Sequence, residues 1–338
     1  MKEYEKLLTV SVAAYNAELY LREVLDSFVN MKRINDTEVL VIDDGGTDSS
    51  LEIAREYERR FPNVFRPIHK NNGGWGSTVN YAIQHSRGKY LKLLDGDDYF
   101  AHNVLDSFIE YLDTVDSDII ISPFSSFKDG ESAEPQIAGS YDPAYIESKI
   151  YNIDNIDKPF SLSMHAITVR SSLLSHNNVV LKEKCVYRDM EYTANILLHA
   201  KTICFFSKPI YMYRLGRDGQ SVSVAQYIKH MDEHADIVYA ILAKTKLTSN
   251  EQRIKLLYKL AEGAHIQQYR IYYYPGTGSE AYRKLQTYNT TIRDNYPEFY
   301  KQIKLPPFYE KLRSIDFKFY YIIRFLLNMR RKLKGFVR

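Results

Sequence analysis

The chain has 338 residues, of which 45% are hydrophobic and 26% are charged, and its formal net charge is +3. This composition is typical of a folded protein and excludes a disordered chain. Two cysteines, Cys185 and Cys204, are too few for a disulfide framework or a zinc cluster. No stretch approaches the ~18–20 uncharged apolar residues of a membrane span, and the apolar run Leu7–Tyr15 is too short for a signal peptide. We therefore expect a cytoplasmic protein.

Residues 1–125 alternate between strand-like and helix-like patterns. Short apolar runs predict five strands, at Thr9–Tyr15, Glu38–Ile42, Val64–Ile68, Tyr90–Leu94 and Asp118–Ser122. Between them, apolar residues recur at helical spacing, first at Leu21, Val24, Leu25 and Phe28. Strands separated by helices predict βαβ crossovers, and therefore a mainly parallel α/β sheet flanked by helices.

Polar residues follow several of these strands. They are Asn16, the pair Asp43-Asp44, the loop Asn72-Gly73-Gly74, and an acid turn formed by Asp95, Gly96, Asp97 and Asp98. Right-handed crossovers place the carboxyl ends of parallel strands at one edge, where open α/β sheets bind ligands. Three neighbouring carboxylates repel one another unless a cation lies among them, and Mg²⁺ or Mn²⁺ prefers such oxygen ligands. A solvated turn capping a helix through Asp98 or Asn103 is the alternative, and the convergence of four polar loops disfavours it.

Two common phosphate-binding motifs are missing from the sequence. There is no Gly-x-x-x-x-Gly-Lys-Ser/Thr loop, and no Gly-x-Gly-x-x-Gly follows the first predicted strand. A P-loop NTPase and a dinucleotide dehydrogenase are therefore disfavoured. Carboxylates with a divalent ion suit a nucleoside diphosphate, whose charge the ion neutralises.

Four segments resemble the successive motifs of family 2 glycosyltransferases, which have the GT-A fold. They are VSVAAYN at 10–16, VIDDGGTD at 41–48, NGG with the later Asn80 at 72–80, and DGDD at 95–98. The resemblance covers residues 7–225. Ala13 stands where the family often has Pro, and Gly46 where it often has Ser, and neither change removes an acid.

The resemblance implies a role for residues along these motifs. The first two segments would hold the nucleotide base, and the acid turn would hold ribose and a metal-bound diphosphate, with Mn²⁺ or Mg²⁺ on Asp97 and Asp98. The donor-binding residues implied in this half are Ala14, Tyr15, Asn16, Glu18, Asp43, Asp44, Asn72, Gly73, Gly74, Asn80, Asp95 and Asp97. Trp75, the only tryptophan, is expected either to stack on a base or sugar or to pack against the sheet.

The second half is expected to supply the acceptor side and a general base. The segment VYRDMEY at 186–192 precedes a helical pattern and resembles the family's acidic catalytic motif, with Arg188 in place of the first acid. Asp189 is therefore the predicted base, and a simple helix cap is the alternative. His165, Arg217, Gln220 and Ser221 are predicted to reach the donor, with a structural histidine and a solvated surface loop as the alternatives.

The C-terminal third differs in composition. From about residue 226 it is helix-rich and dense in tyrosine. Between Arg313 and Arg338 lie eight lysines and arginines against one acid, Asp316, so this segment carries +7 and the rest of the chain −4. The basic, aromatic segment 315–338 suits a lipid interface, or else a helix docked on protein. Because the positive charge is confined to this tail, we predict no nucleic-acid partner.

The sequence thus predicts a GT-A domain over residues 1–225, with a nucleotide-sugar half (1–125) and an acceptor half (126–225), and a helical region over 226–338. The predicted function is an inverting, metal-dependent glycosyltransferase. It would move a sugar from a nucleotide-sugar, most simply a UDP-sugar, to a glycan or polyprenyl-linked glycan in surface polysaccharide synthesis. The alternatives are a sugar-phosphate nucleotidyltransferase and a non-catalytic nucleotide-sugar-binding subunit. The enzyme would work in the cytoplasm, with the inner face of the cell membrane as a second location.

Overall fold

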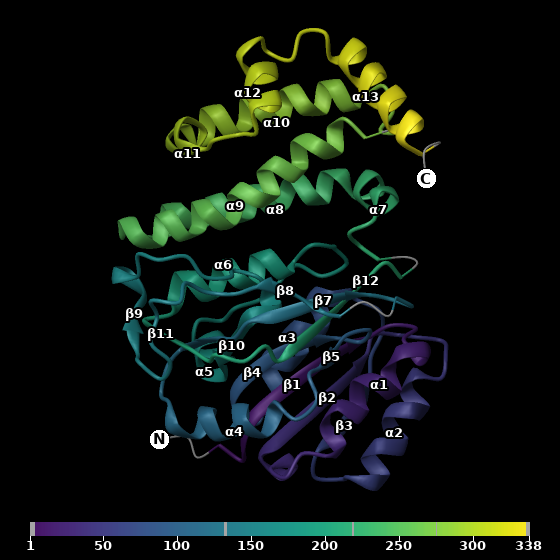
Figure 1. The fold of residues 1–338 in the computed structure, drawn as a ribbon, viewed down its shortest axis with the longest axis vertical. Coiled ribbons are helices and arrows are strands. Elements are labelled where there is room, and N and C mark those ends of the chain that lie inside the picture. The colour runs from purple at the N-terminus through teal and green to yellow at the C-terminus, as the bar shows by residue number, and fades with distance from the viewer. Residues whose placement is uncertain (1–3, 132–133, 218–219, 275, 336–338) are drawn as a thin grey trace. The chain divides into compact units, whose positions relative to one another are not determined.

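The structure, a computed structural model, describes residues 4–131, 134–217, 220–274 and 276–335, with side chains described as far as Met329. Figure 1 shows the course of the chain. Two compact units are present: residues 1–218 with Asn250–Arg253, and residues 219–249 with 254–338. The predicted division after residue 225 falls inside helix α7 (Val224–Lys229), which belongs to the second unit. The domain bounds therefore stay a prediction.

The first unit is built on a mixed eight-stranded sheet. Its strand order is β3 (Phe65–His69), β2 (Thr37–Asp43), β1 (Lys6–Ala14), β4 (Gly88–Asp95), β10 (Ile167–Arg170), β6 (Ile119–Ile121), β11 (Thr202–Phe205) and β9 (Tyr151–Asn152). The first four strands are parallel, and β10 runs antiparallel to both of its neighbours. The chain moves outward from β1 to β3 and then returns to β4 on the other side of β1. In open α/β sheets, a reversal of this kind marks the place where ligands bind, here beyond the carboxyl ends of β1 and β4.

Burial explains why these segments form strands and helices. All seven residues of β2 are buried, as expected for a strand covered on both faces. The predicted apolar face of α1 (Glu18–Val29) is confirmed, because Leu21, Val24, Leu25 and Phe28 are at most 1% exposed. Phe28 packs edge-on against Phe65 of β3. The other helices of this unit are α2 (Ser50–Arg60), α3 (Trp75–His85), α4 (Leu105–Thr114), α5 (Ser171–His176) and α6 (Asp189–His199).

A second, four-stranded sheet was not predicted. Its strand order is β5 (Tyr99–Phe100), β12 (Tyr211–Leu215), β7 (Phe124–Lys128) and β8 (Gln136–Gly139). Arg214 lies on β12 and is 6% exposed. Its guanidinium pairs with Asp129 and Glu23 and donates to the backbone oxygen of Asp97. These partners are far apart in the sequence, so the pattern alone could not show that this arginine is buried.

In its described residues, the second unit consists of helices and the turns between them. The helices are α7, α8 (Met231–Lys244), α9 (Glu251–Tyr272, whose first residues belong to the first unit), α10 (Ala281–Asn295), α11 (Pro297–Gln302), α12 (Pro307–Ser314) and α13 (Tyr320–Gly335). Buried polar side chains join these helices, since His234 of α8 bonds to Gln268 of α9 and Tyr269 of α9 to Asn289 of α10. Among the described residues, no helix is both long and apolar enough to cross a bilayer.

His265, fully buried on α9, should make stability depend on pH. Its Nδ1 lies 2.7 Å from the Tyr288 hydroxyl, and burial lowers its pKa from 6.5 to about 3. Below pH 6.5 the unfolded chain therefore takes up a proton that the folded chain cannot, so His265 costs about 1.4 kcal/mol of stability for each pH unit down towards its folded pKa. We expect His265→Gln to remove this contribution. Urea unfolding followed by far-UV circular dichroism between pH 6.5 and 4.5 tests it, and equal slopes for both proteins would contradict it.

Candidate active site

The acid turn begins where β4 ends, at Asp95, and crosses the end of β1. The N–H of Gly96 donates to the Ala13 oxygen at 2.9 Å. A Cβ on Gly96 would lie 2.7 Å from that same oxygen, so only glycine allows this close approach. The turn is therefore fixed against the end of β1, where the strand order reverses.

Asp98 is the most deeply buried acid of the turn, at 1% exposure. The Tyr211 hydroxyl donates to its Oδ2 at 2.6 Å, and the backbone N–H of Arg214 donates to its Oδ1 at 2.7 Å. Burial, and then the charges of Asp95 and Asp97, raise the pKa of Asp98 well above its usual value. Strand β12 thus holds this carboxylate in place.

Asp95 is oriented by the only tryptophan. The indole Nε1 of Trp75 donates to Asp95 Oδ1 at 2.9 Å. Burial, and then the charge of Asp97, raise the pKa of Asp95 to about 7. Trp75 had been expected to pack or to stack on a ligand, and its hydrogen bond gives it a positioning role.

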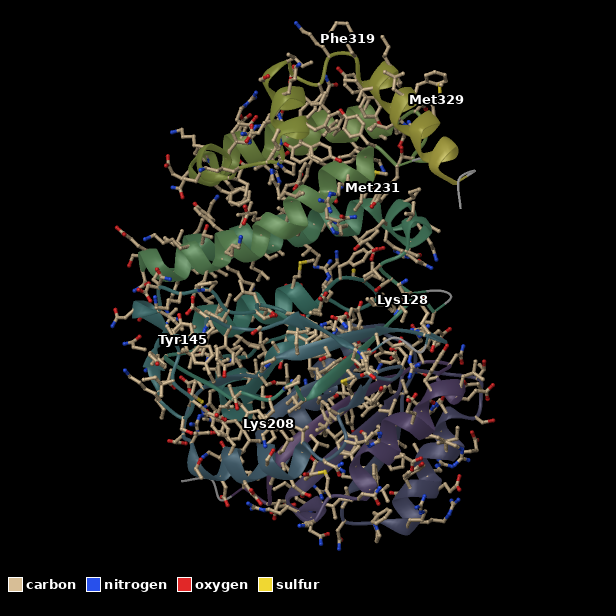
Figure 2. All side chains as sticks on the ribbon, in the orientation of Figure 1. Lys128, Tyr145, Lys208, Met231, Phe319 and Met329 are labelled. Carbon is tan, nitrogen blue, oxygen red and sulfur yellow. The ribbon has the colours of Figure 1, made fainter. Side chains whose placement is uncertain are left out.

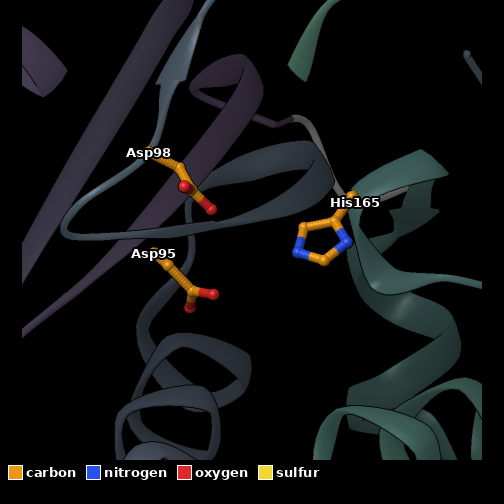
Figure 3. Close-up of side chains that lie close together, drawn as sticks. All are labelled: Asp95, Asp98 and His165. Carbon is orange, nitrogen blue, oxygen red and sulfur yellow. The ribbon is translucent and has the colours of Figure 1, made fainter. Parts of the chain in front are cut away.

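Asp95, Asp98 and His165 come together in space, as Figure 3 shows, with one ligand atom from each within 4.8 Å of the others. The His165 ring stacks on Tyr213, and its Nδ1 lies 2.6 Å from Ser163 Oγ. Burial lowers the pKa of His165 to about 3, which keeps the imidazole neutral and able to act as a ligand. Two carboxylates that repel each other and a neutral imidazole fit a divalent cation such as Mn²⁺.

Asp97 faces a different partner. Its Oδ2 forms an ion pair with Arg217 Nε, and it is not part of the three-residue group. Of the two predicted metal ligands, the structure places Asp98 in that group and Asp97 beside it, next to a cation of the chain. Arg217 was predicted to reach the donor; the structure pairs it with Asp97, and its donor role stays a prediction. Gln220 and Ser221 belong to the second unit, and their donor role stays a prediction.

Asp189 is the first residue of α6, and Arg188 occupies the N-cap position without a side-chain cap bond. Burial raises the pKa of Asp189, while hydrogen bonds from the N–H groups of Met190 and of Asp189 itself act in the opposite direction. The charge of Asp189 also contributes to the raised pKa of Asp95, so the two acids share one electrostatic environment. Arg188, which replaces an acid in the motif, is 3% exposed and pairs with Glu191 at 3.0 Å.

The acids predicted to hold the base are engaged with their own loops. Both oxygens of Asp44 accept hydrogen bonds, from the N–H groups of Gly73 and Gly74 and from Lys70 Nζ, which lies at 2.6 Å. Asp43 binds the N–H of Gly46 and lies 2.6 Å from His69 Nδ1. These acids therefore shape the loops that follow β2 and β3.

Other predicted donor residues also bind backbone. Asn16 accepts from the N–H of Thr47, Glu18 accepts from that of Ser49, and the side chain of Asn72 donates to the Asp44 oxygen. Ala14 is buried at the end of β1, whereas Tyr15 beside it is 58% exposed. The side chain of Asn80 binds the backbone of Leu181, in the segment that precedes Asp189. The sequence did not predict this contact.

Residues 9–174 match the family model described as glycosyl transferase family 2. These residues therefore form a glycosyl transferase family 2 domain. One relative, the minor teichoic acid biosynthesis protein GgaB of Bacillus subtilis, is 26% identical over 75% of the chain but over only 28% of its own length. The poly(ribitol-phosphate) beta-glucosyltransferase of Bacillus spizizenii is 28% identical over 74% of the chain and 39% of its own length. The chain thus spans well under half of these two relatives.

Two solved structures share the fold of this chain. The crystal structure of S. aureus TarS 1-349 in complex with UDP-GlcNAc has a TM-score of 0.63 at 20% identity, covering 85% of this chain and 81% of that one. The mannosyltransferase PcManGT from Pyrobaculum calidifontis, in complex with GDP-Man and Mn²⁺, has a TM-score of 0.51 at 14% identity, covering 88% and 84%. The predicted GT-A fold with a helical C-terminal region is thereby confirmed.

Removing the indole donor should weaken metal binding at the acid turn. We expect Trp75→Phe to lower Mn²⁺ affinity about tenfold, because Asp95 loses the hydrogen bond that orients it. Isothermal titration calorimetry measures the affinity. Tyr81→Phe, on the same helix but stacked on His85, is the control and should bind Mn²⁺ like the wild type. Equal affinities for wild type and Trp75→Phe would refute this positioning role.

Proposed function

We propose that the protein is an inverting, metal-dependent glycosyltransferase that moves a sugar from a UDP-sugar to a hydroxyl group of a glycan or polyol-phosphate acceptor. The observation that carries this proposal is that Asp95, Asp98 and His165 lie close together. The charge of Asp189 acts on Asp95 in the same site. The TarS complex with UDP-GlcNAc supports a uridine nucleotide as the donor.

In the proposed reaction, Asp189 accepts the proton of the acceptor hydroxyl as its oxygen attacks the anomeric carbon. The bond from that carbon to the diphosphate oxygen breaks, and UDP leaves from the opposite face, which inverts the configuration. Asp98 and His165, with Asp95 or Asp97, would hold Mn²⁺ or Mg²⁺, and that ion would neutralise the departing diphosphate. Arg217, paired with Asp97, is placed to exchange its carboxylate partner for a phosphate.

The names of the relatives support the acceptor class. One is a minor teichoic acid biosynthesis protein, and another is a poly(ribitol-phosphate) beta-glucosyltransferase. A β-linked product is the outcome of an inverting transfer from an α-linked nucleotide-sugar. We therefore propose a role in surface polysaccharide or teichoic acid synthesis, on acceptors presented at the inner face of the cell membrane.

A screen of UDP-sugars tests this function. The purified chain should hydrolyse at least one UDP-sugar slowly in the presence of Mn²⁺ or Mg²⁺, and EDTA should abolish the activity. Proton NMR of the released sugar should show the inverted anomer first. Release of pyrophosphate from UTP and a sugar phosphate would instead indicate a nucleotidyltransferase. UDP binding without turnover of any UDP-sugar would indicate a binding subunit, and no UDP binding at any metal concentration would refute the donor site.

A further inference from the structure

Helix α13 exposes an apolar stripe. Ile322, Phe325, Leu326 and Met329 follow the i, i+3, i+4, i+7 spacing of one helix face. Tyr321 lies beside the stripe, and Phe319 lies just before the helix. The exposed fractions are 65% for Phe319, 57% for Tyr321, 59% for Ile322, 62% for Phe325, 57% for Leu326 and 45% for Met329. Figure 2 labels Phe319, just before the helix, and Met329, the last residue of the stripe. Contiguous exposure of this kind marks an interaction surface, whereas single exposed apolar residues are ordinary.

The stripe is exposed on a helix that other contacts hold in place. Tyr320 is 1% exposed, and its hydroxyl donates to the Tyr272 oxygen at 2.5 Å. Phe317, just before the helix, is fully buried and stacks on Tyr269 with ring centroids 5.7 Å apart. Arg324 donates to the Gly278 oxygen at 2.7 Å. The helix is therefore anchored at its first residue, its side with Ile323 and Leu327 is half-buried, and the stripe is the apolar side that stays exposed.

The positive charge of the segment around the stripe indicates which kind of partner covers it. Asp316 is the last acid of the sequence, and Lys318, Arg324 and five further basic residues follow it. A second copy of the chain docked on the stripe would bring two such basic segments together with no acid between them. An anionic lipid surface, in contrast, offers an apolar layer for the stripe and negative headgroups for the basic side chains.

We propose that α13 binds the surface of an anionic phospholipid bilayer, lying in its plane with the stripe inserted among the lipid chains. A 16-residue helix interrupted by charges suits this position and not a spanning one. The inference deepens the membrane location given under the proposed function, but vesicle binding is measured without any sugar transfer. An absence of vesicle binding would therefore refute the membrane proposal, and an absence of sugar transfer would refute the proposed function.

Sedimentation of the full chain with vesicles tests the proposal. We expect binding to vesicles of phosphatidylcholine with phosphatidylglycerol, and roughly tenfold weaker binding to phosphatidylcholine alone or at high salt. The double variant Ile322→Ser/Phe325→Ser should bind the anionic vesicles at least about tenfold more weakly. Ile137→Ser/Ile146→Ser, which removes two exposed isoleucines of the first unit, is the matched control and should bind like the wild type.

Three results would contradict the proposal that α13 binds anionic membranes. If the wild type does not bind anionic vesicles, or binds neutral ones equally well, the proposal is wrong whatever the variants do. If the double variant has an unchanged circular dichroism spectrum and binds as the wild type does, the stripe is not the contact. If the wild type self-associates without lipid and the double variant does not, the occupant is a second copy and the proposal is overturned.

Discussion

Replacing Asp189 with Asn should lower kcat by roughly 10²- to 10⁴-fold and leave the affinity for UDP unchanged. The amide cannot accept the proton of the acceptor hydroxyl, and in the proposed reaction no carboxylate of the acid turn is free to take its place. Rates of UDP-sugar turnover give kcat. The fluorescence of Trp75, which donates to Asp95, reports UDP and metal binding in the same samples.

The nearby acid Glu191 is the matched control. It lies in the first turn of the same helix, and its carboxylate pairs with Arg188 at 3.0 Å. We expect Glu191→Gln to lower kcat by less than about tenfold, because it loses a contact and not the proton acceptor. Normal turnover by Asp189→Asn together with an inactive Glu191→Gln would move the base to Glu191. Loss of UDP affinity in Asp189→Asn would mean that Asp189 serves the donor.

The raised pKa of Asp189 should make kcat depend on pH. Since burial raises this pKa, the carboxylate is protonated at a higher pH than a free aspartate would be. A protonated Asp189 cannot accept a proton, so kcat should fall on the acidic side with a midpoint above the ordinary value of 3.8. The wild-type kcat profile, recorded at saturating donor and acceptor, measures that midpoint.

Local patterns were enough to predict the parallel half of the sheet and the acid turn. The strands around Val10, Val41 and Leu93 are short apolar runs, and the motifs that follow them must meet at one edge once the sheet is parallel. The joining of His165 to Asp95 and Asp98 was not predicted, because it depends on an antiparallel strand, β10, inserted beside β4. No periodicity in the sequence encodes that insertion.

Side-chain partners of polar residues were the least predictable feature. Asp44 was assigned to the nucleotide base from a motif, yet both its oxygens accept hydrogen bonds from the loop at 70–77. Lys92, between the apolar residues Leu91 and Leu93 of β4, is fully buried and donates to the backbone oxygen of His165 at 2.9 Å. A motif identifies which residue types a site needs, but the partner of each side chain depends on tertiary contacts.

Asn80 is another residue whose partner depends on tertiary contacts. Its side chain binds the backbone of Leu181 twice, accepting from the N–H at 2.8 Å and donating to the oxygen at 2.9 Å. Asn80 is 7% exposed, and its partner lies 101 residues away in the sequence. Helix α3 thereby anchors the segment 181–188, which leads directly to Asp189.

Further contacts fix the same segment. The N–H of Lys184 donates to the Gly73 oxygen at 2.5 Å, and a Cβ on Gly76 would lie 2.6 Å from the Lys182 oxygen. Lys184 and Tyr187 have φ angles of 54° and 62°, a region that non-glycine residues rarely occupy. Such conformations persist only where surrounding contacts over-determine them, and they cluster at functional sites. We infer that Asn80 positions Asp189, the proposed base, whereas the sequence motif had assigned Asn80 to the donor.

Asn80→Ala should therefore lower kcat by roughly 10- to 100-fold with little change in UDP affinity, because a base displaced by about 1 Å loses its alignment with the acceptor hydroxyl. Gln84→Ala, an exposed substitution on the same helix, is the control and should keep wild-type kcat. If the Asn80→Ala variant binds UDP more weakly but keeps its kcat at saturating donor, Asn80 is a donor-binding residue and not a positioning residue. A merely structural role would lower thermal stability and leave kcat of the folded fraction unchanged, so active-site titration and a melting curve accompany the rate measurement.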